Sequence, residues 1–333
     1  MNESNHKKVR CYLDQNVIDF LIKGNINSIQ DLINKNQNSE IIYSYVTFRE
    51  FARIDNESNR ALYLNFLKIN EAIYFHIDKN EIVHFEDADP FEQFNLFYNN
   101  SNNYNDLEDS VISMVHKILG GKKDTSFDEV GTSFNNSFGQ LIEDLNAAIN
   151  SLEDHPDIDK NSLKEQLQSA KSNLSEMNDK SMKQLTNSIY NTENPLHEWR
   201  KLCGIKVDQL NAITPPNVID QIWNLLKDEI KRSNSKVTYN DLFGDGWYRH
   251  LSDQDIAMTM KVNGLYGLLN FMGYYPDKNI RDDRKFIPFI NDQQHVGHAI
   301  YADYFITRDK RLKKKADAVY EHLKIKTKII FVE

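Results

Sequence analysis

The sequence predicts an α/β protein in which both ends of the chain build one parallel sheet, with an all-helical insertion between them. Strand-like and helix-like segments alternate within residues 1–104, and the same alternation returns within residues 286–333. Residues 105–285 show mainly helical periodicity. Because alternating strands and helices are typical of a parallel sheet covered by helices, we expect the two ends to share a single core.

The amino-terminal part is expected to run strand, helix, strand, helix. Residues 9–13 are a short apolar run that predicts a buried strand. Residues 16–23 predict a helix that ends at Gly24, a residue that readily adopts the positive φ of a helix C-terminus. Residues 41–46 are β-branched and aromatic, which favours a second strand, and a second helix is predicted over residues 47–54.

The carboxy-terminal part repeats this order. Residues 292–301 carry apolar side chains at helical spacing, and residues 304–307 predict a short strand. Residues 310–323 predict an amphipathic helix with a basic side, and residues 328–332 predict a last, β-branched strand.

The insertion is expected to contain a long helical hairpin. Two stripes of apolar residues at helical spacing lie on either side of a break at residues 154–157. The stripes are Leu141, Leu145, Ala148 and Leu152, and then Leu163, Leu167, Ala170 and Leu174. Pro215 and Pro216 mark a further boundary, and Ser252 with Asp255 resembles a helix start.

The composition is typical of a folded globular protein. Of the 333 residues, 40% are hydrophobic and 27% are charged, and the formal net charge is -9. No run approaches the roughly 18 apolar residues of a membrane span, and residues 1–10 lack the apolar region of a secretory signal. Cys11 and Cys203 are too few for a disulfide scaffold and have no CxxC partner. We therefore expect a cytoplasmic protein.

Four carboxylates lie where the carboxyl ends of the predicted strands meet. Asp14 follows the first strand, and Glu50 lies in the helix after the second strand. Asp292 opens the helix that leads into the third strand, and Asp309 follows that strand. Sites in parallel sheets collect at this edge. Carboxylates held close together repel one another unless a divalent cation compensates them, and ligands made only of oxygen favour Mg²⁺ or Mn²⁺.

Each acid also has a purely structural interpretation. Asp14, Asp292 and Asp309 suit the N-caps of the helices that follow them. Thr47 and Glu50 fit the S/T-x-x-E capping box. The catalytic hypothesis therefore depends on the joint placement of the four acids.

Three stretches resemble motifs of the PIN-domain nucleases. They are residues 12–16 (YLDQN), residues 46–51 (VTFREF) and residues 292–309, in which an acid opens a helix and a strand ends in Thr-x-Asp. The resemblance covers roughly residues 7–77 and 286–333. The insertion has no counterpart in a minimal PIN domain.

The resemblance implies a metal-dependent endonuclease that uses a metal-activated water. The metal ligands and catalytic residues would be the acidic quartet Asp14, Glu50, Asp292 and Asp309. Asn16 and Thr307 would give these acids polar support. The cofactor would be Mg²⁺ or Mn²⁺.

Two histidines in the third motif allow two interpretations. His295 and His298 lie one helical turn apart, which is compatible with a zinc site. Because no cysteine lies nearby, we favour a hydrogen bond from His295 to Asp292, which would orient that carboxylate.

A run of basic residues directly follows Asp309. It comprises Lys310, Arg311, Lys313, Lys314 and Lys315. Such a run is most often a solvated helix face, but at the rim of a metal site it would hold substrate phosphates. We therefore expect a nucleic-acid partner, with RNA favoured over DNA.

Two other functions fit the same pattern. A haloacid-dehalogenase-like phosphohydrolase also has Asp after its first strand, but its chemistry requires Asp-x-Asp and this chain has Asn16. A PIN-like domain without activity would be a scaffold or interaction protein. The insertion is expected to gate or select the substrate, and the alternative is a surface for a homo-oligomer or a protein partner. RNA processing and defence against phage are both compatible with these features.

Overall fold

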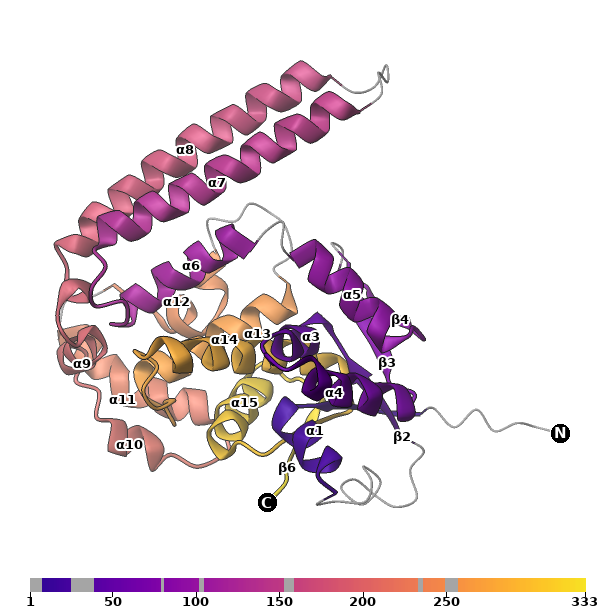
Figure 1. Ribbon diagram of the computed structural model, residues 1–333. Helices are drawn as coiled ribbons and strands as arrows, with labels where there is room; N and C mark the ends of the chain where they lie inside the picture. Colours follow the sequence, from indigo (N-terminus) through magenta and orange to yellow (C-terminus); the bar gives the residue numbers. More distant parts are fainter. Residues whose placement is uncertain are drawn as a thin grey trace. The chain divides into compact units, whose positions relative to one another are not determined.

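Two compact units make up the chain. The computed structural model describes residues 8–24, 39–78, 81–101, 105–152, 159–232, 236–248 and 257–333, whose helices and strands are drawn in Figure 1. The first unit, here called the sheet unit, comprises Met1–Tyr98, Cys203–Lys278 and Ile287–Glu333. The second, here called the hairpin unit, comprises Asn99–Leu202 and Asn279–Phe286.

A mostly parallel sheet of six strands forms the centre of the sheet unit, in the order β4-β3-β2-β1-β5-β6. The strands are β1 (Val9–Leu13), β2 (Ser39–Tyr43), β3 (Ile73–Ile77), β4 (Val83–Glu86), β5 (Tyr304–Thr307) and β6 (Lys328–Phe331). Only β3 and β4 pair in antiparallel fashion. The prediction of an α/β fold whose sheet takes strands from both ends of the chain is confirmed.

The other elements within the described residues are helices. They are α1 (Gln15–Ile22), α3 (Tyr45–Ala52), α4 (Glu57–Ile69), α5 (Pro90–Ser101), α6 (Asn105–Ile118), α7 (Phe127–Ser151), α8 (Lys160–Thr186), α9 (Pro195–Leu202), α10 (Val207–Asn211), α11 (Val218–Arg232), α12 (Tyr239–Phe243), α13 (Met258–Met272), α14 (Asp283–His298) and α15 (Lys310–His322). Short 3₁₀ turns cover η1 (Ile189–Asn191), η2 (Asp245–Tyr248) and η3 (Ala299–Tyr301). No helix in the described part of the chain combines the length and the apolar character that a membrane crossing needs.

The predicted first residues of two helices differ from those in the structure. The helix expected from residue 292 begins at Asp283, and the helix expected from Thr47 begins at Tyr45. Ser44 caps the latter by accepting a hydrogen bond from the backbone N–H of Val46. The expected helix start at Ser252 and Asp255 lies outside the described residues, and α13 is seen from Met258 onward.

Both faces of the sheet are covered, as expected for a parallel sheet. On one face, Cys11 and Leu13 join a core that includes Val17 of α1 and Phe48 of α3. Side chains alternate along a strand, so Tyr12 points to the other face, where its ring lies 6.0 Å from those of Phe75 and Phe305. β1 is therefore held between two packed layers.

The predicted domain boundaries, 1–104, 105–285 and 286–333, differ from the two units. Residues 203–278 were expected in the insertion, but they cluster with the sheet unit. The physical reason is that α11 and α13 both pack against α15, the helix that follows β5. Helical periodicity alone does not reveal which core a helix joins.

The hairpin unit contains two long helices, α7 and α8, which lie side by side and run in opposite directions (Figure 1). A capping box of Ser126 and Glu129 starts α7, and Asp159 caps α8. The buried line differs from the predicted stripes, because Leu145 and Leu163 are more than a third exposed, whereas Met182 is buried. The expected break at residues 154–157 lies outside the described residues.

Candidate functional site: a carboxylate cluster at the sheet edge

Asp14 lies directly after β1 and begins α1. Its Oδ1 accepts a hydrogen bond from the Asn16 backbone N–H at 3.2 Å, and its Oδ2 accepts one from the Thr307 hydroxyl at 2.8 Å. Its N-cap role is therefore real, and Asn16 contributes its backbone while its side chain is exposed. Burial, followed by the charge of Glu50, raises the pKa of Asp14. Hydrogen bonds thus hold the Asp14 carboxylate in place, but nearby positive charge does not offset its burial and its repulsion from Glu50.

Glu50 lies inside α3, and its side chain points to the same edge of the sheet. Because Ser44 is the N-cap of α3, the capping-box interpretation of Thr47 and Glu50 is wrong. The Glu50 Oε2 instead lies 2.8 Å from Nε2 of His295, and both side chains are largely buried. Glu50 therefore takes part in a contact between α3 and α14.

His295 joins Glu50 to a buried chain of hydroxyls. Its Nδ1 lies 2.8 Å from the Tyr12 hydroxyl, which lies 3.2 Å from Oγ of Ser44. The predicted hydrogen bond from His295 to Asp292 is wrong, because both ring nitrogens have these other partners. Burial works to lower the pKa of His295, but the charge and the hydrogen bond of Glu50 outweigh it, so the net pKa is raised.

His298 has a separate environment. Its Nδ1 pairs with the backbone carbonyl of Gln294 at 2.9 Å, and its ring packs edge-on against Tyr45. Burial lowers the pKa of His298 to about 4. His295 and His298 thus do not converge, which argues against the zinc interpretation.

Asp292 lies in the middle of α14 and not at its start, so the prediction that it opens a helix is wrong. It is partly buried, and among the described residues its carboxylate has no hydrogen-bond partner. Its pKa is raised well above the ordinary value, first by burial and then by neighbouring carboxylates. Those carboxylates, in decreasing order of effect, are Asp14, Asp277, Glu50 and Asp309.

Asp309 follows β5 and caps α15. Its Oδ1 accepts hydrogen bonds from the backbone N–H groups of Arg311 and Leu312 at 2.6 and 2.9 Å. Its own N–H donates to the Thr307 hydroxyl at 3.0 Å. Because the same hydroxyl donates to Asp14, Thr307 ties two of the four acids together and supplies the polar support expected of it.

The prediction that all five basic residues of α15 face nucleic acid is wrong for Lys315. It was expected to face nucleic acid, but none of its side chain is exposed. Its ammonium forms an ion pair with Asp277 and donates to Oδ1 of Asn270 at 3.1 Å. The spacing of residues within α15 could have predicted this burial, because Lys315 lies on the same helix face as the buried residues Leu312 and Ala316.

The other basic residues of α15 lie nearer the surface. Lys310 is exposed, Lys313 pairs with Asp317 at 2.7 Å, and Lys314 lies 5.9 Å from the centroid of the Tyr275 ring. Arg311 is partly buried. Four of the five predicted basic residues thus remain candidates for contact with a phosphate backbone.

Two residues near the four predicted acids had no prediction, namely Asp277 and Tyr266. The four acids together with Asp277 are here called the carboxylate cluster. Asp277 follows the C-terminus of α13, where no motif marks it. Tyr266 is fully buried in α13, and its hydroxyl has no hydrogen-bond partner among the described residues. Burial first, and then the charges of four carboxylates led by Asp292, raise the pKa of Tyr266.

The carboxylates do not form a ready-made coordination shell. Among the described residues, no group of three or more His, Cys, Asp or Glu side chains is arranged to hold a metal ion. The acids act on one another electrostatically, as the raised pKa of Asp292 shows, while several are held by hydrogen bonds to the protein.

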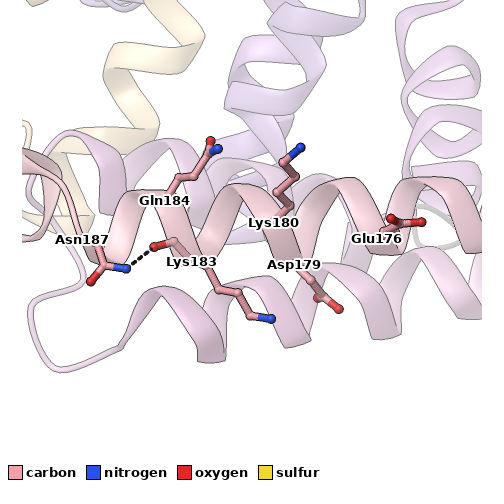
Figure 2. Close-up of a pocket in the computed structure, with 6 residues that line it drawn as sticks. All are labelled: Glu176, Asp179, Lys180, Lys183, Gln184 and Asn187. Atoms are coloured by element: carbon pink, nitrogen blue, oxygen red, sulfur yellow. Dashed lines mark hydrogen bonds between the residues drawn. The ribbon is translucent and has the colours of Figure 1, made fainter.

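A shallow hollow on the hairpin unit offers no comparable chemistry. It lies along α8 and is lined by exposed residues of both charges, drawn in Figure 2: Glu176, Asp179, Lys180, Lys183, Gln184 and Asn187. Figure 2 shows these side chains spread along one helix, with Asn187 bonded to the backbone of Lys183. Their exposure leaves their charges screened by water.

Comparisons of the chain with family models, with characterised proteins and with solved structures found no match.

Proposed function

We propose that the chain is a metal-dependent nuclease that hydrolyses phosphodiester bonds, with RNA as the favoured substrate. The observation that carries the proposal is Asp292, a partly buried carboxylate without a hydrogen-bond partner among the described residues, whose pKa is raised first by burial and then by four other carboxylates. Such repulsion is relieved when a divalent cation binds. The resemblance to PIN-domain nucleases supports the same proposal through residues 12–16, residues 46–51 and the Thr-x-Asp end of the third motif, whereas Asp292 lies inside α14 and does not open it.

The donor set fits Mg²⁺ or Mn²⁺. The ligands would be Asp14, Glu50, Asp292 and Asp309, which offer only oxygen atoms. The buried hydroxyl of Tyr266, which has no partner among the described residues, lies within the influence of Asp292, Asp309 and Asp14 and could donate to an oxygen bound with the ion. A bound ion would lower the pKa of a coordinated water and stabilise charge on the phosphate.

The surrounding residues have distinct roles in this proposal. Thr307 and the backbone N–H of Asn16 hold the Asp14 carboxylate in one orientation. His295 holds Glu50, and the buried hydroxyl of Tyr12 holds His295. Such supporting hydrogen bonds keep ligands in place and tune their basicity.

The basic side of α15 is proposed to bind the substrate backbone. Lys310, Arg311, Lys313 and Lys314 follow Asp309 in the chain, so they lie on the helix that begins at the acid cluster. Contacts with phosphates position a nucleic acid without reading its sequence. Lys315 does not belong to this basic side, because its side chain is buried.

The test combines metal binding with cleavage. Calorimetric titration with MnCl₂ is expected to show binding to the wild-type chain and at least a tenfold loss in Asp292→Asn, which removes the charge at nearly constant volume. Labelled single-stranded RNA and DNA of one sequence are then incubated with Mn²⁺, and RNA is expected to be cut faster. Asp55→Asn is the matched control, because Asp55 is exposed.

The alternatives predict other outcomes. A scaffold without activity would bind no Mn²⁺ and cut neither nucleic acid. Haloacid-dehalogenase-like chemistry would hydrolyse small phosphomonoesters, and the exposed Asn16 in place of its second acid argues against it. Cleavage that survives unchanged in Asp292→Asn would refute the proposed site.

A further inference from the structure

A buried ammonium lies at the carboxylate cluster. Lys315 on α15 has no exposed side-chain surface, and its Nζ contacts Asp277 and Asn270. The same Nζ lies 4.5 Å from the centroid of the Tyr266 ring, over the face of the aromatic system. A carboxylate, an amide oxygen and an aromatic ring thus hold one cation in a fixed place.

This cation belongs to the same electrostatic system as the proposed metal ligands. The charge of Lys315 interacts with the carboxylate of its contact partner Asp277, and also with the carboxylates of Asp292 and Asp309. Asp277 in turn acts on Asp292. On the other side of the cluster, Glu50 is compensated by its contact with His295. Lys315 therefore compensates the half of the cluster that His295 does not reach.

Tyr266 gives independent evidence that a ligand belongs beside Lys315. Its hydroxyl is buried and has no partner among the described residues, although it lies within the influence of carboxylates from four parts of the chain. Buried hydroxyls without a partner are uncommon in proteins. A donor left unpaired among acids is suited to an oxygen of a water or a phosphate bound at the cluster.

We propose, on the basis of the proposed metal-dependent function, that Lys315 takes the place of a second metal ion, so that the cluster holds a single divalent cation. Two-metal sites place their ions about 3.5–4 Å apart and need carboxylates that are free to bridge them. Here one flank of the cluster already contains a fixed positive charge in a water-poor environment, where repulsion of another cation is strong. Asp277, held by Lys315, is removed from the set of available ligands.

The experiment measures the number of Mn²⁺ ions bound per chain, by calorimetry and by electron paramagnetic resonance on the whole 333-residue chain. The wild type is expected to bind one ion. Lys315→Met is expected to bind a second ion, or to bind the first at least tenfold more tightly. Lys315→Arg keeps the charge and should bind one ion. Lys328→Met, on an exposed position of β6, is the control and should match the wild type.

A second variant covers the case in which Lys315→Met does not fold. Asp277→Asn combined with Lys315→Met removes both members of the ion pair, so no buried charge is left unpaired, and it should also admit a second ion. Two ions in the wild type would overturn the inference. So would stoichiometry and affinity within twofold of the wild type in whichever folded variant carries Lys315→Met. A wild type that binds no Mn²⁺ would instead refute the proposed function itself.

Discussion

The hydroxyl of Thr307 is expected to be the most sensitive supporting group of the carboxylate cluster. It donates to Asp14 at 2.8 Å and accepts from the backbone N–H of Asp309 at 3.0 Å, and the side chain is fully buried. Thr307→Val has nearly the same shape and removes both hydrogen bonds at once. The change therefore isolates the chemistry of the hydroxyl from the packing of the strand.

The expected loss of stability is the sum of two effects. A hydrogen bond to a charged group contributes about 1.5–3 kcal/mol, and a buried donor left without a partner costs about 1–3 kcal/mol. The free energy of unfolding should therefore fall by about 2.5–6 kcal/mol. The Thr307 hydroxyl also works to lower the pKa of Asp14, so its removal should raise that pKa further.

Urea denaturation at pH 7 measures this loss, with Thr307→Ser as the matched control. Serine keeps the hydroxyl and deletes one buried methyl group, which should cost about 1 kcal/mol. A valine variant as stable as the serine variant would refute the reasoning, because the two hydrogen bonds would then contribute nothing. Repeating the series near pH 4 should shrink the difference, since protonated Asp14 needs the donor less.

Three further outcomes are expected. Because burial lowers the pKa of His298 to about 4, below its value of about 6.5 in the unfolded chain, stability should fall by about 3 kcal/mol as the pH drops through that interval. In a urea series against pH, His298→Gln should flatten that fall, and an unchanged slope contradicts the assignment. Gly297→Ala places a Cβ 2.4 Å from Oδ1 of Asn263 and should lower the free energy of unfolding by about 1–3 kcal/mol. Gly139→Ala is the control, because its Cβ meets only the flexible end of Lys171, and it should raise the free energy of unfolding by up to about 1 kcal/mol. Equal melting temperatures for the two variants would show that α13 and α14 move apart to fit the added methyl group. Lys313 and Lys314 changed together to Gln should weaken RNA binding and reduce its salt dependence in fluorescence anisotropy, and an unaltered salt slope would identify a solvated surface.

The strands near both chain ends could be predicted because their signals are local. Apolar and β-branched runs at residues 9–13 and 304–307 coincide with β1 and β5. The hairpin of β3 and β4 was not predicted, and β4 alternates exposed and partly buried residues as an edge strand does. The start of α14 was also missed, because residues 283–291 contain Pro288, which usually argues against a helix interior.

The acids of the site could be predicted from their positions after strands, but their partners could not. Asp14 follows β1 directly and Asp309 follows β5 after one intervening residue, so the pairing of β1 with β5 brings these two acids to one edge of the sheet. The partner of His295 lies 245 residues away, on another helix. The burial of Lys315 depends on Asp277, which reaches it only through the packing of α13 on α15. Long-range packing of this kind leaves no local pattern in the sequence.

The pairing of β1 with β5 has a consequence for how the chain is made. β1 is synthesised long before its neighbour β5, which begins at Tyr304. Until that residue has been translated, one side of β1 presents unpaired backbone groups along an apolar strand, which favours association with other chains. Asp309 arrives in the same step. Nascent chains are therefore expected to depend on chaperones, and to gain the complete set of acids only after β5 has been synthesised and has paired with β1.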